Sequence, residues 1–295
     1  MTELAFLGTG TMGLPMARRL LGAGLVVHAW NRSVERARPL ERDGAQVFGD
    51  PRSATAGCSR MVTMLSDADA VLDAAKRAID GLDGDGTWIQ MSTIGIEATQ
   101  RCAELADQAG VGFVDAPVLG TRAPAEQGQL VILASGPSAS RSACAPVFDA
   151  VGARSLWLGE AGTGSRLKVA INSWIVGVVA TLAETITLAE ALGLDPESFF
   201  EAVADGPLDL PYARVKGAAM MTKSFDDVSF RLALSRKDAD LVLAAAAEAG
   251  IELPVMGAVA DRLRAAQDAG HGDDDMAATY WASATPSVPR PQTSD

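Results

Sequence analysis

A glycine-rich turn close to the amino terminus constrains this chain more than any other feature. The sequence Gly8-Thr9-Gly10-Thr11-Met12-Gly13 has the spacing G-x-G-x-x-G, and it joins an apolar segment at residues 4–7 to a helical pattern at 12–21. In that context the first glycine permits a tight turn, the second lets the backbone approach a pyrophosphate, and the third lets the helix pack closely on the strand. The phosphates would meet the N–H groups at the helix N-terminus. The motif therefore predicts a dinucleotide-binding βαβ unit.

Short apolar segments alternate with helical patterns along the first half of the chain. Strands are predicted at residues 4–7, 25–30, 47–48, 61–65, 88–91, 113–116, 130–134 and 156–158. Helices are predicted between most of them, as at residues 68–79 and 97–109. Strands that alternate with helices form βαβ units and a mainly parallel sheet. The predicted fold class is α/β, with an N-terminal Rossmann-type doubly wound sheet followed by an all-α domain.

The strand pattern stops near residue 162. Residues 165–192 read as one long interdomain helix ended by Gly193, and further helices are predicted at 230–249 and 254–269. The expected domains are a dinucleotide-binding domain at 1–161 and an all-helical substrate and dimerisation domain at 162–286. The polar, proline-rich residues 287–295 are expected to be a disordered tail.

The middle of the long helix also bears on assembly. Residues 174–180 are apolar on every face, a pattern typical of a helix buried between a domain core and a partner subunit. We therefore expect a homodimer.

Composition excludes several function classes. The formal net charge of −12 and the lack of basic runs argue against nucleic acid, whose phosphates require Lys and Arg. Cys58, Cys102 and Cys144 are scattered and the only histidines are His28 and His271, so neither a disulfide framework nor a metal site is expected. With no signal peptide at the start and no apolar run long enough to span a bilayer, we expect a cytoplasmic protein without a membrane partner.

The second predicted strand ends in Asn31-Arg32-Ser33. NAD sites place Asp or Glu at this position to bind the ribose 2′-OH, and an acid would repel the 2′-phosphate of NADP. Here Arg32 offers a guanidinium that can bind a phosphate through two hydrogen bonds. The segment indicates a preference for NADP(H), with NAD(H) as the second choice. The alternative is that Arg32 is a solvated loop charge.

Three other segments carry polar groups whose role the pattern leaves open. Lys168 and Asn172 project from one face of the long helix, and the lysine is as compatible with a surface position as with a functional one. Residues 115–121 follow a strand end, where α/β sheets bind ligands, but they are also compatible with a structural turn. Residues 236–238 read more readily as a solvated helix face than as a cofactor contact.

Seven segments together resemble the β-hydroxyacid dehydrogenase family. They run from Phe6 to Leu241 in family order and at family spacing, and they read FLGTGTMGLPMARRLL, VHAWNRS, MLSD, MSTI, FVDAPVLGTRAPAEQGQLVILASG, GTGSRLKVAIN and FRLALSRKDADL. The chain is most similar to the glyoxylate/succinic semialdehyde reductase branch and to the 3-hydroxyisobutyrate dehydrogenase relatives.

The resemblance implies roles for the residues at matching positions. The implied cofactor-binding residues are Gly8, Gly10, Thr11, Met12, Gly13, Asn31, Arg32, Ser33, Met64, Leu65, Ser66, Thr93 and Lys237. The implied substrate-binding residues are Thr93, Leu119, Gly120, Thr121, Lys168, Phe230 and Asp238. Lys168 matches the family's catalytic lysine and Asn172 its catalytic neighbour.

The function implied is hydride transfer between NADP(H) and a small carbonyl or hydroxy compound, with Lys168 as general acid or base. The family usually reads DAPVSGG, and here Leu119 replaces the serine and Thr121 the second glycine. Ile171 replaces the first asparagine after the lysine.

These departures leave an alternative open, an imine reductase acting on C=N, although such enzymes usually lack the lysine. A more remote alternative is a non-catalytic, dehydrogenase-like scaffold that binds a partner, but those relatives lose the lysine.

Overall fold

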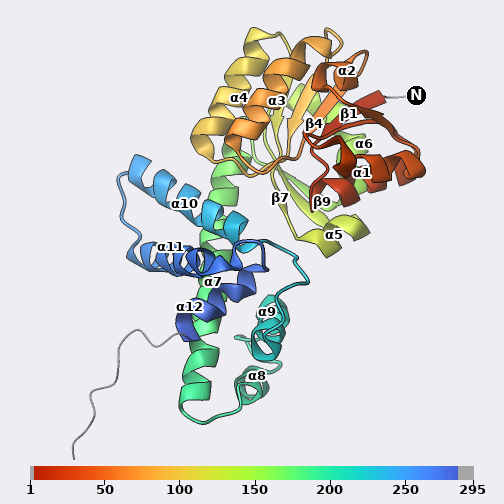
Figure 1. The fold of residues 1–295 in the computed structure, drawn as a ribbon. Helices are drawn as coiled ribbons and strands as arrows, with labels where there is room; N and C mark the ends of the chain where they lie inside the picture. The colour runs from red at the N-terminus through yellow and green to blue at the C-terminus, as the bar shows by residue number, and fades with distance from the viewer. Residues whose placement is uncertain (1–2, 285–295) are drawn as a thin grey trace, which may run out of the picture. The chain divides into compact units, whose positions relative to one another are not determined.

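The computed structural model describes residues 3–284 (Figure 1). The chain forms two compact units, Met1–Ala170 and Ile171–Asp295, and the division falls inside the long helix α7 (Thr163–Ala191). Each unit has buried apolar side chains of its own. The tail expected at residues 287–295 lies outside the described residues.

A parallel six-stranded sheet forms the centre of the first unit. Its strands are β1 (Glu3–Leu7), β2 (Val26–Trp30), β3 (Gln46–Phe48), β4 (Arg60–Thr63), β5 (Thr87–Gln90) and β6 (Gly112–Asp115). They lie in the order β3-β2-β1-β4-β5-β6, and every pairing is parallel. The strand order reverses between β1 and β4, which makes this position the topological switch point of the sheet. Sheets of this type bind ligands there, outside the carboxyl ends of the strands. The predicted Rossmann-type sheet is confirmed.

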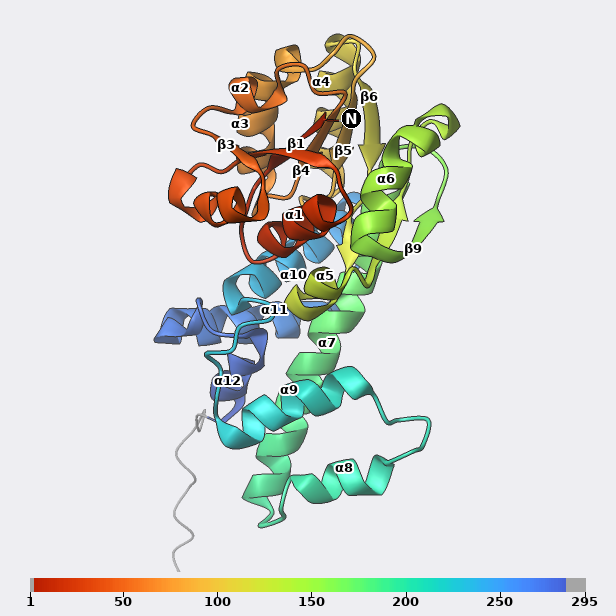
Figure 2. The ribbon, with the colours of Figure 1, turned by 90° about the vertical axis from the view of Figure 1, so that its right-hand side faces the viewer.

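Helices cover both faces of this sheet (Figure 2). One face packs against α1 (Gly13–Gly22), α5 (Arg122–Gln127) and α6 (Arg141–Val151), and the other against α2 (Pro51–Thr55), α3 (Ala68–Ala78) and α4 (Ile96–Gln108). Alternate side chains of β1 point to opposite faces, so Phe6 joins the first core and Leu7 the second. Short helical turns complete the unit: η1 (Val34–Arg36), η2 (Arg38–Asp43), η3 (Ile79–Gly81) and η4 (Ser138–Ser140).

The last strands form a separate sheet, which the sequence did not predict. β7 (Val118–Leu119), β8 (Leu130–Ala134) and β9 (Gly152–Trp157) lie in that order, with β7 antiparallel to β8 and β9 parallel to it. One antiparallel bridge, between Asp115 and Ser135, joins β6 to the segment after β8. The chain leaves the large sheet at Pro117, which has no N–H to donate to a strand ladder.

The described part of the second unit is helical, as predicted. After α7 come α8 (Glu197–Val203), α9 (Pro211–Thr222), α10 (Leu232–Glu248), α11 (Pro254–Ala266), η5 (Gln267–His271), η6 (Met276–Thr279) and α12 (Tyr280–Ala284). The sequence predicted α10 and α11 but not α9 or α12. The helix expected to run to residue 269 passes into the π-helical turn η5 at Gln267.

Helix α7 is the core helix of the second unit. Val176, Val179, Ala183 and Ile186 are buried along it, and the chain leaves it at Gly193, whose φ is +74°. The sequence predicts no apolar segment long enough to span a bilayer. By length and hydropathy alone, however, α7 as a whole meets that requirement. Its buried face and its place in a helical domain explain the composition without a membrane.

A buried ion pair ties three segments of the second unit together. Lys216 of α9 is 2% exposed, and its Nζ donates to Asp275 Oδ1 at 2.6 Å and to Ser229 Oγ at 2.8 Å. Asp275 also accepts hydrogen bonds from the backbone N–H groups of Ser229, Phe230 and Ala277. Burial raises the pKa of Asp275, but the Lys216 ammonium and these donors outweigh it and hold the pKa below its usual value. The pair fixes the chain around Phe230, just before α10.

We expect Lys216→Met to lower the free energy of unfolding by about 3–5 kcal/mol, because it leaves the Asp275 carboxylate buried without its cation. Chemical denaturation at neutral pH measures this, with Lys76→Met as the matched control, since Lys76 is an exposed lysine of α3. Because the pKa of Asp275 is lowered in the folded protein, its contribution to the free energy of unfolding is lost as the pH falls through that lowered pKa. The difference in free energy of unfolding between wild type and Lys216→Met should therefore shrink below about pH 4. Equal stability of Lys216→Met and Lys76→Met would contradict this account.

Candidate active site

The turn between β1 and α1 has the geometry of a phosphate-binding loop. Gly8 has φ +108°, and a Cβ on it would collide with the carbonyl oxygen of Met64. A Cβ on Gly13 would collide with the carbonyl oxygen of Gly8, so the start of α1 can approach the turn after β1 only with glycine at position 13. At Gly10 nothing lies within 4 Å of the Cβ position. The protein's own packing requires Gly8 and Gly13, whereas Gly10 leaves the loop open on its outer side.

Thr9 carries a polar atom without a partner in this loop. The residue is 3% exposed, and its Oγ1 has no hydrogen-bond partner among residues 3–284. A buried hydroxyl is normally paired, so this one fits a ligand with acceptor oxygens. The open backbone at Gly10, the N-terminus of α1 and the Thr9 hydroxyl together suit a pyrophosphate. The residues present therefore fit a dinucleotide.

Asn31 links this loop to the end of β2. Its Oδ1 accepts from the backbone N–H of Thr9 at 3.1 Å, and its Nδ2 donates to the carbonyl oxygen of Ser33 at 3.0 Å. Gly8 N–H also donates to the carbonyl oxygen of Trp30 at 2.8 Å. Arg32 is exposed, and no salt bridge holds it within the described part of the chain. The asparagine shapes the loop while the neighbouring guanidinium stays solvated.

The carboxyl ends of β4 and β5 meet beside the same loop. Leu65 N–H donates to Ser92 Oγ at 2.8 Å, which brings the predicted residues 64–66 next to the segment that holds Thr93. Gln90 orders that segment: its Oε1 accepts from Ser92 N–H at 2.6 Å, and its Nε2 donates to the Ser92 carbonyl at 2.8 Å. Sequence reasoning missed Ser92 and Gln90, because their role depends on which strands are neighbours.

Asp115, at the end of β6, anchors the start of α7. This fully buried carboxylate accepts from the N–H and the hydroxyl of Ser165, both at 2.8 Å, and from the Ser135 hydroxyl at 3.1 Å. Burial raises the pKa of Asp115, and the serine hydrogen bonds oppose part of that rise. Segment 115–121 thus begins with a structural residue, and Lys168, 8% exposed, lies less than one turn beyond Ser165.

Leu119 to Thr121 form a turn between β7 and α5. Gly120 has φ +128°, and a Cβ there would come within 2.7 Å of Leu130 Cδ2 and 3.0 Å of Pro124 Cβ. Only glycine suits this position, because any side chain would clash and strain the backbone at this φ. Leu119 is half-buried, and Thr121 occupies the N-cap of α5 without a side-chain cap.

In the second unit the structure brings together Asn172 and Asp238. Nδ2 of Asn172 donates to Oδ2 of Asp238 at 2.8 Å, and both residues are buried. Lys237 Nζ lies 3.0 Å from Asp238 Oδ1. The sequence pattern favours a solvated helix face for residues 236–238, but Asp238 is 4% exposed. Phe230 is held through its backbone, its N–H by Asp275 and its carbonyl by Met276.

Thiolate and metal chemistry have no candidates among residues 3–284. Burial raises the pKa values of Cys58, Cys102 and Cys144 to about 12, so these thiols stay protonated at neutral pH. No group of three or more His, Cys, Asp or Glu side chains in this range could hold a metal ion.

Two family models together cover most of the chain. The model of the NAD binding domain of 6-phosphogluconate dehydrogenase matches residues 3–159, and the model described as NAD-binding of NADP-dependent 3-hydroxyisobutyrate dehydrogenase matches residues 162–282. The chain belongs to the β-hydroxyacid dehydrogenase family. This dehydrogenase is therefore an NAD(P)-dependent oxidoreductase that acts on hydroxyl or carbonyl groups.

Curated and solved relatives agree with this assignment. The dehydrogenase is 33% identical to the chloroplastic glyoxylate/succinic semialdehyde reductase 2 of Arabidopsis thaliana over 283 residues, 95% of this chain and 79% of that protein. It is 28% identical to 3-hydroxyisobutyrate dehydrogenase of Mycobacterium tuberculosis, solved with L-serine, at a TM-score of 0.86 over 95% of this chain and 98% of that one. An imine reductase from Pseudomonas sp. shares the fold at a TM-score of 0.62 and 24% identity, over 95% of this chain and 99% of that one.

Proposed function

We propose that this dehydrogenase reduces a small carbonyl compound with NADPH, and catalyses the reverse reaction, with Lys168 as the general acid. The observation that carries the proposal is the position of Lys168, a buried lysine on a turn of α7 that Asp115 and Ser165 anchor at the carboxyl edge of the dinucleotide-binding sheet. A buried lysine is rare unless it has a function or a charged partner. We take residues 1–161 as the dinucleotide-binding domain and 162–286 as the domain for substrate binding and dimerisation.

The mechanism assigns one task to each group of residues. The dinucleotide-binding residues in this proposal are residues 8–13, Asn31 to Ser33, Met64 to Ser66, Thr93 and Lys237. When bound, the nicotinamide supplies or accepts the hydride. Lys168 donates a proton to the substrate oxygen as negative charge develops there, and its own positive charge stabilises that charge before the proton moves. The substrate-binding residues in this proposal include Gly120, Thr121, Phe230 and Asp238.

We expect Lys168→Ala to lower turnover by roughly 10²–10⁴-fold, the usual size of a general-acid contribution, while the affinity for NADPH hardly changes. Steady-state kinetics and a fluorescence titration with NADPH measure the two effects. Arg166→Ala is the matched control, since Arg166 is an exposed cation on the same stretch of α7 and should leave turnover near the wild-type value. Retained turnover in Lys168→Ala would remove the lysine from the mechanism.

The cofactor preference rests on the segment after β2. An aspartate at position 31 could still accept from Thr9 N–H but would repel a 2′-phosphate, whereas the present Asn31 is neutral and leaves Arg32 exposed to bind it. The preference for NADPH over NADH follows from that charge arrangement.

Arg32→Ala should lower kcat/KM for NADPH about ten- to more than a hundredfold, the worth of a charge-assisted hydrogen bond, and leave kcat/KM for NADH nearly unchanged. Adding Asn31→Asp should invert the preference. Arg42→Ala, an exposed arginine of η2, is the control. If kcat/KM of the wild type is the same for NADH as for NADPH, the proposed role of Arg32 is wrong.

Leu119 sets the substrate class in this proposal. A serine at this position would donate a hydrogen bond to a substrate carboxylate, but the half-buried leucine donates none and keeps water away. The backbone N–H groups of Gly120 and Thr121 still offer donors. We infer a less polar aldehyde or ketone as substrate, and this same apolar surface is what keeps a C=N substrate as the second candidate.

The wild type should therefore turn over glyoxylate and succinic semialdehyde poorly and apolar carbonyl compounds better. Leu119→Ser should raise kcat/KM for the carboxylate substrates about ten- to more than a hundredfold and lower it for apolar ones. Leu119→Val, which stays apolar, is the control and should not shift the ratio. Efficient reduction of succinic semialdehyde by the wild type, or an unchanged ratio in Leu119→Ser, would overturn the assignment. A protein that binds NADPH but reduces no carbonyl or imine would instead be a scaffold.

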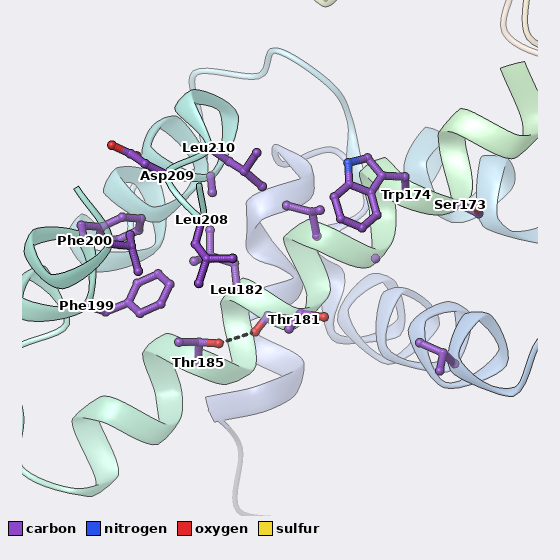
Figure 3. A pocket seen from close by; sticks show the side chains of 15 residues that line it. Ser173, Trp174, Thr181, Leu182, Thr185, Phe199, Phe200, Leu208, Asp209 and Leu210 are labelled. Atoms are coloured by element: carbon purple, nitrogen blue, oxygen red, sulfur yellow. Dashed lines mark hydrogen bonds between the residues drawn. The ribbon is translucent and has the colours of Figure 1, made fainter. Parts of the chain in front are cut away.

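We also propose a homodimer in the cytoplasm, assembled through the second unit. An apolar groove of about 410 Å³ runs along α7, α8 and α9 (Figure 3), and none of the predicted site residues lines it. At its rim Trp174 is 66% exposed, Leu208 73% and Val255 77%. Contiguous exposed apolar side chains of this size mark an interaction surface. Light scattering at micromolar concentration should give twice the chain mass of 30.5 kDa, and Trp174→Asp should reduce it; a monomeric wild type would contradict the proposal.

A further inference from the structure

The hydrogen bond between Asn172 and Asp238 has a chemical direction. An ionised carboxylate only accepts hydrogen bonds, so an amide that faces it must present its NH₂ end. Nδ2 of Asn172 does so, at 2.8 Å from Asp238 Oδ2. The other carboxylate oxygen lies 3.0 Å from Lys237 Nζ. Within the described part of the chain Oδ1 has no hydrogen-bond partner although the Lys237 ammonium lies beside it, whereas Oδ2 accepts from the Asn172 amide. The amide of Asn172 therefore donates a direct hydrogen bond to this buried carboxylate.

The pairing determines which end of the Asn172 amide points elsewhere. With Nδ2 held by Asp238, the carbonyl oxygen Oδ1 is directed away from the carboxylate. Asn172 and Lys168 are four residues apart in α7, and side chains on a helix lean toward its N-terminus. The amide of Asn172 therefore leans over the turn from which Lys168 projects.

We propose that Asp238 is a positioning residue, which orients the Asn172 amide so that Oδ1 accepts a hydrogen bond from the Lys168 ammonium. This inference rests on the proposed function of Lys168, and it gives Asp238 a task other than direct contact with the substrate. An amide oxygen holds the ammonium in place without a full negative charge. A carboxylate in its place would favour the charged lysine more strongly and make it a weaker acid.

The amide orientation can be observed directly because the chain has two asparagines, Asn31 and Asn172. Selective ¹⁵N labelling of asparagine gives two side-chain NH₂ signals by NMR, and Asn31→Asp leaves only that of Asn172. The expected result is one Asn172 Nδ2 proton that exchanges slowly with water in the wild type and at least tenfold faster in Asp238→Ala. Equal exchange in both proteins would overturn the proposal. Lys237→Ala is the control, since it removes the other partner of Asp238 and should leave the exchange slow.

An exchange of the two side chains tests the consequence for Lys168. The single variant Asn172→Asp places a second carboxylate against that of Asp238. The repulsion between them should lower Tm by roughly 5 °C or more. Asn172→Asp combined with Asp238→Asn restores a donor opposite an acceptor, so most of the lost Tm should return. The exchange also brings a carboxylate to Lys168, whose pKa should rise by about one unit or more. The chain has five lysines, so ¹³C-labelled lysine resolves the titration, and Lys168→Met identifies the signal.

A double variant no more stable than Asn172→Asp, or a Lys168 pKa equal to that of the wild type, would overturn the inference. Neither readout needs a substrate or turnover. If Lys168→Ala keeps its activity while these measurements succeed, the proposed function fails and the orientation of Asn172 stands.

Discussion

A buried carboxylate anchors the start of α7, the helix that carries the proposed general acid. Asp115 accepts hydrogen bonds from the backbone N–H and hydroxyl of Ser165 and from the Ser135 hydroxyl. Desolvation raises the pKa of Asp115, and these donors, with the positive end of the α7 dipole, oppose part of that rise. The register of everything farther along α7 is set at this point: Lys168 follows Ser165 by three residues, and Asn172 by seven. Removing the anchor would displace the lysine without touching it.

Buried polar pairs fix the position of the chain at two further places. Apolar side chains fill both cores, but apolar packing is tolerant of small shifts. Hydrogen-bonded polar pairs are directional. In this protein they are Asp115 with Ser165 at the start of α7, Lys216 with Asp275 next to the backbone of Phe230, and Asn172 with Asp238. Leu119 is the exception, an apolar residue at a position where the family resemblance implies a serine. In the proposed function it is the residue that sets the substrate class, and none of these polar pairs includes it.

Sequence patterns predicted what is local. The glycine spacing identified the phosphate loop, because Gly13 is required by a contact with Gly8 inside the same turn, and alternating segments identified the sheet. Gly8 is also required by the carbonyl oxygen of Met64, a contact that the local pattern does not contain. The second sheet escaped prediction, since β7 has only two residues and pairs antiparallel. The polar anchors join residues far apart in sequence, 50 positions for Asp115 with Ser165 and 59 for Lys216 with Asp275. No pattern within one segment could indicate those pairs. The pattern left the role of Lys168 open, and its catalytic role is a prediction that rests on the resemblance.

The central claim is that this protein moves a hydride from NADPH to a carbon that carries oxygen. NADPH deuterated in turn at each face of C4 tests it, with mass spectrometry of the products from a panel of aldehydes, ketones and cyclic imines. The account predicts one deuterium on the carbinol carbon of an alcohol, from one of the two labelled forms only, and little label in any amine. Deuterium found only in amines would make the enzyme an imine reductase, and NADPH binding without label in any product would contradict the account altogether.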